Sequence, residues 1–182
     1  VDITLTGDKE KIETVIKDNK LKLLQFLNSF NSKLIKIFSL SFDSQTLEFE
    51  LEGKAQTRNP SYALASVANG IFVANEAGKH SGASSFQEKG NRIAQTAGPL
   101  QTGAAPCFLM LFDEGRYLLT ADYSGGSISV FPVSEGQLQE RADLLEFEGS
   151  GPVKGRQESS HIHQIRQVPQ IEGIEGEWLL AS

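Results

Sequence analysis

Apolar residues occur in short runs along most of this chain, and glycine-containing turns separate the runs. Some runs are almost continuously apolar, as in FLMLF at 108–112, whereas others alternate apolar with polar residues, as in SISVF at 127–131. Short runs bounded by turns such as those at Gly115 and Gly136 are typical of strands paired in hairpins. The pattern predicts an all-β chain in which a buried hairpin is followed by a half-exposed one.

The same order of runs recurs along the chain. Residues 60–78, PSYALASVANGIFVANEAG, align with residues 106–125, PCFLMLFDEGRYLLTADYSG. Phe38, Phe86 and Phe131 mark equivalent positions that are 48 and then 45 residues apart. A period of this length with four short strands per repeat is typical of β-propeller blades. The repeat therefore predicts about three four-stranded antiparallel blades.

The predicted blades are too few to close a ring, because propellers close with roughly four to eight blades. An open series of blades leaves strand edges and an apolar blade face uncovered, which favours association. We therefore expect the 182 residues to be a fragment of a larger ring, or to self-associate through the open sides. The outer strands are expected to end near Phe49, Ile93 and Leu145.

Residues 1–30 follow a different pattern. From Asp8, which can act as an N-cap, apolar residues recur at helical spacing, with an interruption at Asn19 and Lys20. This spacing predicts a short N-terminal helix. The chain is thus divided into residues 1–30 and a partial propeller over residues 31–182.

Composition and charge exclude several functions. The net charge of −6 argues against nucleic-acid binding, which depends on a basic surface. No apolar run reaches the roughly 18 residues of a membrane span, and the N-terminus lacks the order of a signal peptide. We expect a cytoplasmic protein with no membrane partner, or one whose signal peptide has been removed. The single cysteine, Cys107, is expected to be a buried, inert thiol.

The richest cluster of ionisable residues lies in GSGPVKGRQESSHIH at 149–163, which contains Arg156, Gln157, His161 and His163. On a strand, the two histidines would share one face because they are two residues apart. A histidine can take a proton from water near neutral pH, and an arginine can hold an oxyanion or a phosphate. Alternatively, Arg156 and Gln157 cap a loop and the histidines satisfy buried carbonyl groups.

The four strands of a blade alternate in direction, so successive connections open alternately on the two rims of the propeller. The links between blades therefore lie on the same rim as the turns between second and third strands. Polar residues distant in sequence are therefore expected to meet at one rim. These residues are Asn75, Glu76, Asp122, Tyr123, Ser124, Arg156, Gln157 and His161. An H-x-H pair can also bind a metal ion, but the sequence does not place His80, Glu76 or Asp122 close by as a third ligand. We expect neither a metal nor another cofactor.

Two motifs resemble one family. RQESSHIH at 156–163 follows ADYSGGSISVF at 121–131, and this order is similar to that in the β-propeller lactonases of the 6-phosphogluconolactonase type. The resemblance covers roughly residues 33–182 and implies the N-terminal portion of a seven-bladed ring without a metal. The chain departs from the family at Asp122, where asparagine is usual, and at residues 23–32, which lack the family's Gly-Thr-Tyr-Thr turn.

The resemblance implies hydrolysis of a phosphorylated sugar lactone, 6-phospho-D-glucono-1,5-lactone, to 6-phosphogluconate in the pentose phosphate pathway. The catalytic residues would then be His161 as general base, Arg156 as anion binder and Glu76. The substrate-binding residues would be Gln157, His163, Asn75, Asp122, Tyr123 and Ser124. Two alternatives stay open: a lactonising cyclase of the muconate type, and a catalytically silent propeller fragment that acts as a binding or assembly module.

Overall fold

The computed structural model describes residues 36–168 and 176–182, apart from residues 44, 47, 67, 69 and 91. This part of the chain is all-β, and its only helical segment is the 3-10 turn η1 (Gly78–His80). No helix in the described ranges is long and apolar enough to cross a membrane. The helix predicted within residues 1–30 lies outside the described residues.

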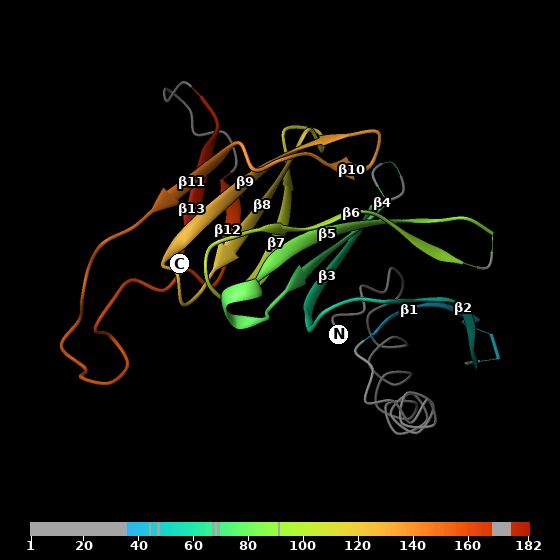
Figure 1. Cartoon of the computed structure of the whole chain (residues 1–182), viewed down its shortest axis with the longest axis horizontal. Coiled ribbons are helices and arrows are strands. Elements are labelled where there is room, and N and C mark those ends of the chain that lie inside the picture. Colours follow the sequence, from blue (N-terminus) through green and yellow to red (C-terminus); the bar gives the residue numbers. More distant parts are fainter. Residues whose placement is uncertain are drawn as a thin grey trace.

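The strands form antiparallel units in chain order (Figure 1). The first unit is the pair β1 (Lys36–Asp43) and β2 (Glu48–Gln56). The second unit contains β3 (Pro60–Ser66), β4 (Gly70–Asn75), β5 (Gly82–Glu88) and β6 (Ile93–Gln101). The third contains β7 (Pro106–Phe112), β8 (Tyr117–Asp122) and β9 (Ser127–Ser134), with β10 (Gln137–Leu138) and β11 (Asp143–Glu146) both paired to β9. The last is the pair β12 (Ile165–Val168) and β13 (Trp178–Ala181).

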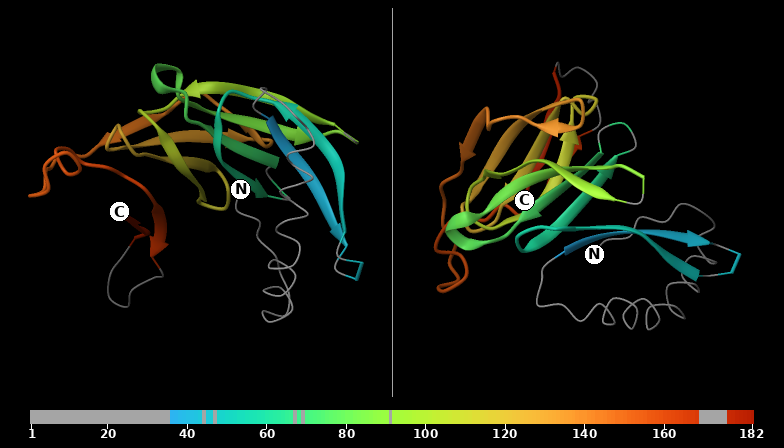
Figure 2. Two further views of the ribbon diagram at one scale, coloured as in Figure 1. Left: turned by 90° about the horizontal axis from the view of Figure 1, so that it is seen from below. Right: turned by 45° about the vertical axis from the view of Figure 1, so that its right-hand side comes forward.

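These units are consecutive blades of a β-propeller. The innermost strands are neighbours, because β3 and β4 pack against β7, which in turn contacts β12. The pair β1–β2 supplies the outer strands of the preceding blade, and β2 contacts β6. Figure 2 shows the units following one another along an arc, from β1 and β2 at one end to β12 and β13 at the other. The predicted series of blades is confirmed.

The outer strands extend further than the sequence predicts. Strand β2 runs to Gln56 and β6 runs to Gln101, so Phe49 and Ile93 lie where these strands begin. The outermost strand of a blade is half exposed, so its polar residues continue the strand where an end was expected. In β2, exposed and partly buried residues alternate along most of the strand. Strand β11 ends at Glu146, next to the expected position at Leu145.

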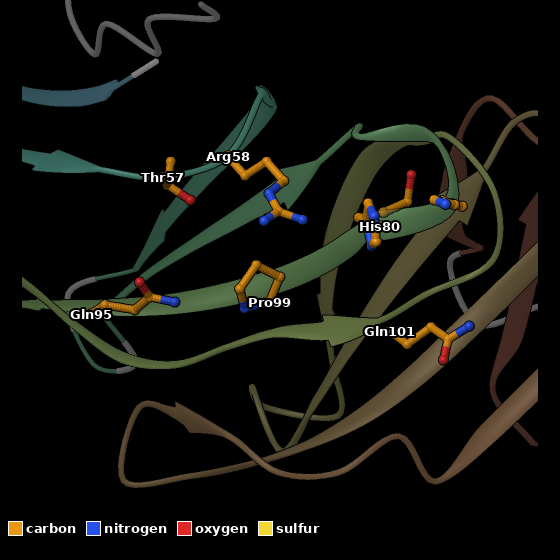
Figure 3. A pocket seen from close by; sticks show the side chains of 8 residues that line it. Thr57, Arg58, His80, Gln95, Pro99 and Gln101 are labelled. Carbon is orange, nitrogen blue, oxygen red and sulfur yellow. The ribbon is translucent and has the colours of Figure 1, made fainter. Parts of the chain in front are cut away.

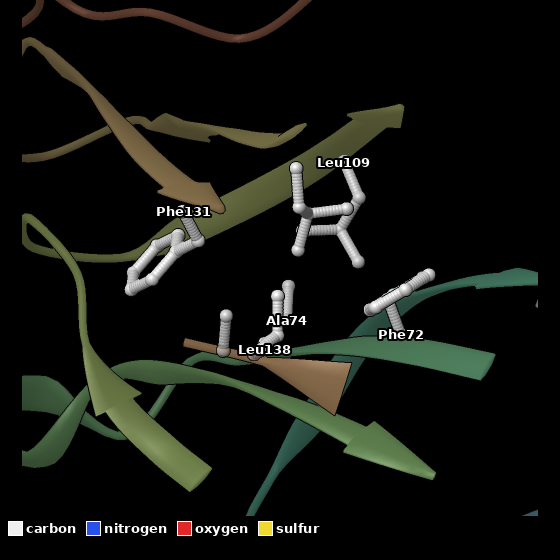
Figure 4. Close-up of a cluster of buried hydrophobic side chains, with 7 residues drawn as sticks. Phe72, Ala74, Leu109, Phe131 and Leu138 are labelled. Carbon is white, nitrogen blue, oxygen red and sulfur yellow. The ribbon is translucent and has the colours of Figure 1, made fainter. Parts of the chain in front are cut away.

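Apolar side chains fill the space between successive blades. Between the second and third units, Phe72, Leu109 and Phe131 are almost completely buried and pack with small residues such as Ala74 (Figure 4). Burial of each large side chain contributes about 1.5–3 kcal/mol. A second cluster, with Ile165 at its centre, joins the third unit to β12. The blades therefore stabilise one another in series.

Candidate functional site

Strands β4 and β8 end at the rim where the links between blades enter the innermost strands. The backbone N–H of Glu76 donates to the carbonyl of Asn59 at 2.9 Å. The equivalent N–H of Tyr123 donates to the carbonyl of Ala105, also at 2.9 Å. Each link is therefore bonded to the strand end of its own blade. The predicted residues 75–76 and 122–124 thus occupy equivalent places on one rim.

Asn75 forms hydrogen bonds to the first link, residues 57–59 between β2 and β3, through a buried amide. Its side chain is completely buried, and Nδ2 donates to Thr57 Oγ1 at 2.8 Å and to the Arg58 carbonyl at 2.5 Å. Its Oδ1 accepts from Ser84 Oγ at 2.7 Å. Both the NH₂ group and the oxygen of the Asn75 amide therefore form hydrogen bonds with other protein groups. The structure thus gives Asn75 a positioning role, and its contact with substrate stays a prediction.

Asp122 forms a hydrogen bond to the second link, residues 102–105 between β6 and β7, through a buried carboxylate. Its side chain is completely buried. Oδ2 accepts from Gly103 N at 3.0 Å, Ser127 Oγ at 3.2 Å and Ser129 Oγ at 2.7 Å, while Oδ1 accepts from Thr120 Oγ1 at 2.7 Å. Burial raises the pKa of Asp122, and the four donors oppose that shift. The carboxylate therefore points into the protein, and its predicted contact with substrate is likewise left open.

Three rings meet at the surface of the rim. The rings of Tyr123 and His161 are stacked, with centroids 4.5 Å apart and an interplanar angle of 11°. The His163 ring meets Tyr123 edge-on at 5.8 Å. Both histidines therefore contact the same tyrosine, His161 by stacking and His163 edge-on. They do not lie on a strand as the sequence predicts, because β12 begins only at Ile165. We call Tyr123, His161 and His163 the rim cluster.

A backbone hydrogen bond determines the tautomer of His161. Its Nδ1 lies 3.0 Å from the carbonyl oxygen of Tyr123. A carbonyl oxygen only accepts hydrogen bonds, so Nδ1 carries the hydrogen. In the neutral imidazole, Nε2 then has the free lone pair. The basic nitrogen of neutral His161 is thus Nε2.

The turn after Tyr123 positions His161. Gly126 adopts a positive φ of 57°, and its N–H donates to the Tyr123 carbonyl at 3.3 Å. A Cβ at Gly126 would lie 2.6 Å from the carbonyl oxygen of Ser160. Glycine is therefore needed for the chain before His161 to lie against this turn. Ser124 is exposed within the same turn.

Cys107 lies next to the rim cluster. Its Sγ is 3.6 Å from the His163 carbonyl oxygen and 3.7 Å from that of Ala121. Burial raises the pKa of Cys107, and the negative charges of Glu76 and Asp122 raise it further. The thiol therefore stays protonated, as expected for an inert cysteine. Cys107 is half-buried and not buried as predicted, because it lies near the start of β7 at the rim. Glu76 is exposed directly after β4 on the same rim.

Arg156 and Gln157 lie apart from the rim cluster. They belong to an exposed loop between β11 and β12 that extends away from the sheets (Figure 1). Gln157 Oε1 accepts from Val153 N at 3.2 Å, and the N–H of Arg156 donates to the Val153 carbonyl at 3.3 Å. Among the described residues, these contacts stay within the loop. The structure does not bring Arg156 together with Glu76 and His161, so its role in binding an anion remains a prediction.

A cavity on the second blade contains functional groups that the sequence patterns do not indicate. Its volume is about 400 Å³ (Figure 3). The lining residues are Thr57, Arg58, Lys79, His80, Ser81, Gln95, Pro99 and Gln101. Arg58 lies in the link before β3, and Lys79 and His80 lie in the turn between β4 and β5. In a four-stranded blade these two segments open on the same rim, so the sequence could have indicated that these basic residues lie near one another. Within the described ranges, no group of three or more His, Cys, Asp or Glu side chains is arranged to hold a metal ion.

Comparison with known families supports the fold and the class of protein. A family model described as "Lactonase, 7-bladed beta-propeller" matches residues 27–174. A 6-phosphogluconolactonase of Bacillus subtilis (strain 168) is 30% identical over 143 residues, which are 76% of this chain and 40% of that protein. The chain therefore spans less than half of the length of this curated relative.

Solved structures agree with this comparison. A putative 6-phosphogluconolactonase from Bacteroides fragilis matches with a TM-score of 0.68 and 34% identity, over 82% of this chain and 42% of that chain. A putative 6-phosphogluconolactonase from Bacteroides uniformis matches with a TM-score of 0.65 and 28% identity, over 80% of this chain and 42% of that chain. The blades described above are thus similar to part of each of these longer chains.

Proposed function

The chain belongs to the lactonase family of seven-bladed β-propellers, and from this membership we propose that it takes part in hydrolysis of a sugar lactone. The substrate proposed is 6-phospho-D-glucono-1,5-lactone, and the product is 6-phosphogluconate in the pentose phosphate pathway. Similar proteins from Bacillus subtilis and Bacteroides fragilis carry the name 6-phosphogluconolactonase. This agreement in name supports the choice of substrate.

The observation that carries the proposal is the hydrogen bond from His161 Nδ1 to the Tyr123 carbonyl, 3.0 Å long. It leaves Nε2 free to remove a proton from water as the water oxygen adds to the lactone carbonyl. The tetrahedral intermediate then collapses, and the ring C–O bond breaks. The imidazolium returns its proton to the departing ring oxygen, so the histidine is regenerated.

Neighbouring groups would stabilise the charges that form in this reaction. The imidazolium would keep its Nδ1–H bond to the Tyr123 carbonyl and its stacking on the Tyr123 ring. We assign the exposed carboxylate of Glu76 to binding sugar hydroxyls or stabilising the imidazolium. Arg156 precedes His161 on the exposed loop and lies apart from the rim cluster, so we assign it to the substrate phosphate, at a distance from the reacting carbonyl, through its two-pronged guanidinium.

The reaction is tested by replacing His161. We expect His161→Ala to lower kcat for 6-phospho-D-glucono-1,5-lactone on the order of 10²-fold, as for loss of a general base. The matched control is Cys107→Ser, which keeps a donor toward the same carbonyls. A serine already occupies the equivalent position of the neighbouring blade, where Ser61, the second residue of β3, donates from Oγ to the Pro106 carbonyl at 2.9 Å. Equal rates for His161→Ala and the parent would exclude His161 as the base.

A binding measurement keeps the proposal testable even if the chain by itself turns over no lactone. Addition of 6-phosphogluconate should shift the imidazole NMR signals of His161 and His163, and gluconate should shift them less. Absence of both turnover and binding would overturn the proposal and favour the catalytically silent module.

The exposed side chains of the last strand support a second role, in assembly. Trp178 is 51% exposed and Leu180 is 62% exposed, in strand β13 at one end of the arc. Exposed apolar residues on an edge strand favour pairing with another chain. We therefore propose that these 182 residues by themselves self-associate through β13. Light scattering should show a mass that rises with concentration, and a constant monomer mass would contradict this role.

A further inference from the structure

The cavity on the second blade is basic although the chain is acidic overall. The chain has 17 Lys and Arg residues against 23 Asp and Glu residues. The cavity lining nevertheless contains Arg58, Lys79 and His80 and no acidic residue. Within the described part of the chain, the salt bridge present joins Arg116 to Asp113, away from this lining. The described residues therefore leave the positive charge of the cavity without an ion-pair partner.

The backbone around the cavity is held in place by hydrogen bonds. The carbonyl of Arg58 accepts from the buried Asn75 amide, so this hydrogen bond holds the backbone of Arg58 in place. Ser81 closes the turn that carries Lys79 and His80, because its Oγ accepts from Ala77 N at 3.2 Å and its N–H donates to the Gly78 carbonyl at 3.1 Å. The basic side chains thus extend from two backbone segments that hydrogen bonds hold in place, the link that contains Arg58 and the turn that contains Lys79 and His80.

Figure 3 shows the Arg58 side chain reaching into the space between His80 and Pro99, with Gln101 at the far side. Gln95 is held at the other end, because its Nε2 donates to the Gly98 carbonyl at 2.5 Å. The cavity, of about 400 Å³, is open to solvent, and its Arg58, Lys79 and His80 side chains are exposed. It therefore suits a charged group bound at the surface more than a fully enclosed ligand. An arginine and a lysine that line one cavity suit a phosphate group, whose oxygens accept several charged hydrogen bonds.

We propose that this cavity binds the phosphate group of a small metabolite, with Arg58 and Lys79 as the principal contacts. None of the residues in the rim cluster lines the cavity. The proposed site is therefore separate from the proposed base, and it does not depend on the lactonase activity.

Isothermal titration of the chain with inorganic pyrophosphate, 6-phosphogluconate and gluconate tests the proposal. The first two ligands should bind and gluconate should not; binding of 6-phosphogluconate alone would identify a phosphosugar as the ligand of this site only where Arg58→Ala weakens it and His161→Ala does not. We expect Arg58→Ala to weaken binding at least about 10-fold, since it removes a charged two-pronged contact. The fold should be retained, because the Arg58 carbonyl that Asn75 contacts is part of the backbone.

Lys89→Ala is the matched control, because Lys89 is exposed in the turn between β5 and β6 and does not line the cavity. It removes the same unit of charge and should leave the Kd unchanged. His161→Ala should also bind pyrophosphate like the parent, so failure of the lactonase proposal would not affect this result. Equal weakening by Arg58→Ala and Lys89→Ala, or no binding of any phosphate, would overturn the proposed site.

Discussion

Asn75 and Asp122 end equivalent strands in neighbouring blades, and both side chains are completely buried beside a link. The Asn75 amide donates to the link, through Thr57 Oγ1 and the Arg58 carbonyl. Asp122 instead accepts from the link, through the N–H of Gly103. The two blades thus hold their links with hydrogen bonds of opposite direction, and each strand end matches the groups that its own link presents.

The links themselves explain this difference. Thr57 and Gly103 both lie three residues before the proline that opens the inner strand. Thr57 offers a hydroxyl oxygen, whereas Gly103 offers only its backbone N–H. A Cβ at Gly103 would lie 2.7 Å from Asp122 Oδ2 and 2.2 Å from Ser127 Oγ. The second link therefore has no room for a side chain and needs an acceptor at the strand end.

Asn75→Asp should give the largest effect, because it places a buried carboxylate against the Arg58 carbonyl that now accepts a hydrogen bond. We expect the free energy of unfolding at pH 7 to fall by about 3 kcal/mol. Urea denaturation followed by circular dichroism measures the loss. The loss should shrink at low pH, where protonation restores a donor. A change below about 0.5 kcal/mol would show that the direction of these bonds does not matter.

Substitutions of Asp122 should separate the need for an acceptor from the need for a charge. Asp122→Ala leaves the hydroxyls of Ser127 and Ser129 without their carboxylate acceptor and removes one of the two acceptors of the Gly103 N–H, the other being Ser129 Oγ at 3.0 Å. We therefore expect a loss of about 2–3 kcal/mol. Asp122→Asn should stay within about 1 kcal/mol of the parent, because its oxygen can replace Oδ2 while its NH₂ faces Thr120 Oγ1, which can accept. Equal losses in the same denaturation assay would refute this account.

The pH dependence of Asp122→Asn gives the smallest effect and tests the charge directly. Burial raises the pKa of Asp122 above its ordinary value, so the folded state binds this proton more tightly than the unfolded state. The parent should therefore lose stability relative to Asp122→Asn as pH rises from the ordinary pKa through the folded pKa. Above that interval the difference should be constant. A difference that does not change with pH would show that the carboxylate is fully compensated by its donors.

Much of the fold was predictable because it depends on local chemistry. The period between Phe86 and Phe131, the alternation of side chains and the glycines at the hairpin turns are properties of short segments. Gly115 and Gly136 indeed adopt positive φ angles of 86° and 72°. The ends of β2 and β6 were predicted less well, because polar residues on a half-exposed outer strand resemble those of a turn.

The sequence by itself determined the series of all-β blades, the rim that carries the strand ends and the motif that contains both histidines. Only the tertiary structure decided that the Asp122 carboxylate turns inward, that Arg58 and Lys79 share a cavity, and that His161 Nδ1 meets a carbonyl 38 residues away in sequence. These features depend on which donors and acceptors the packed blades bring together. A residue's own identity and its near neighbours do not contain that information.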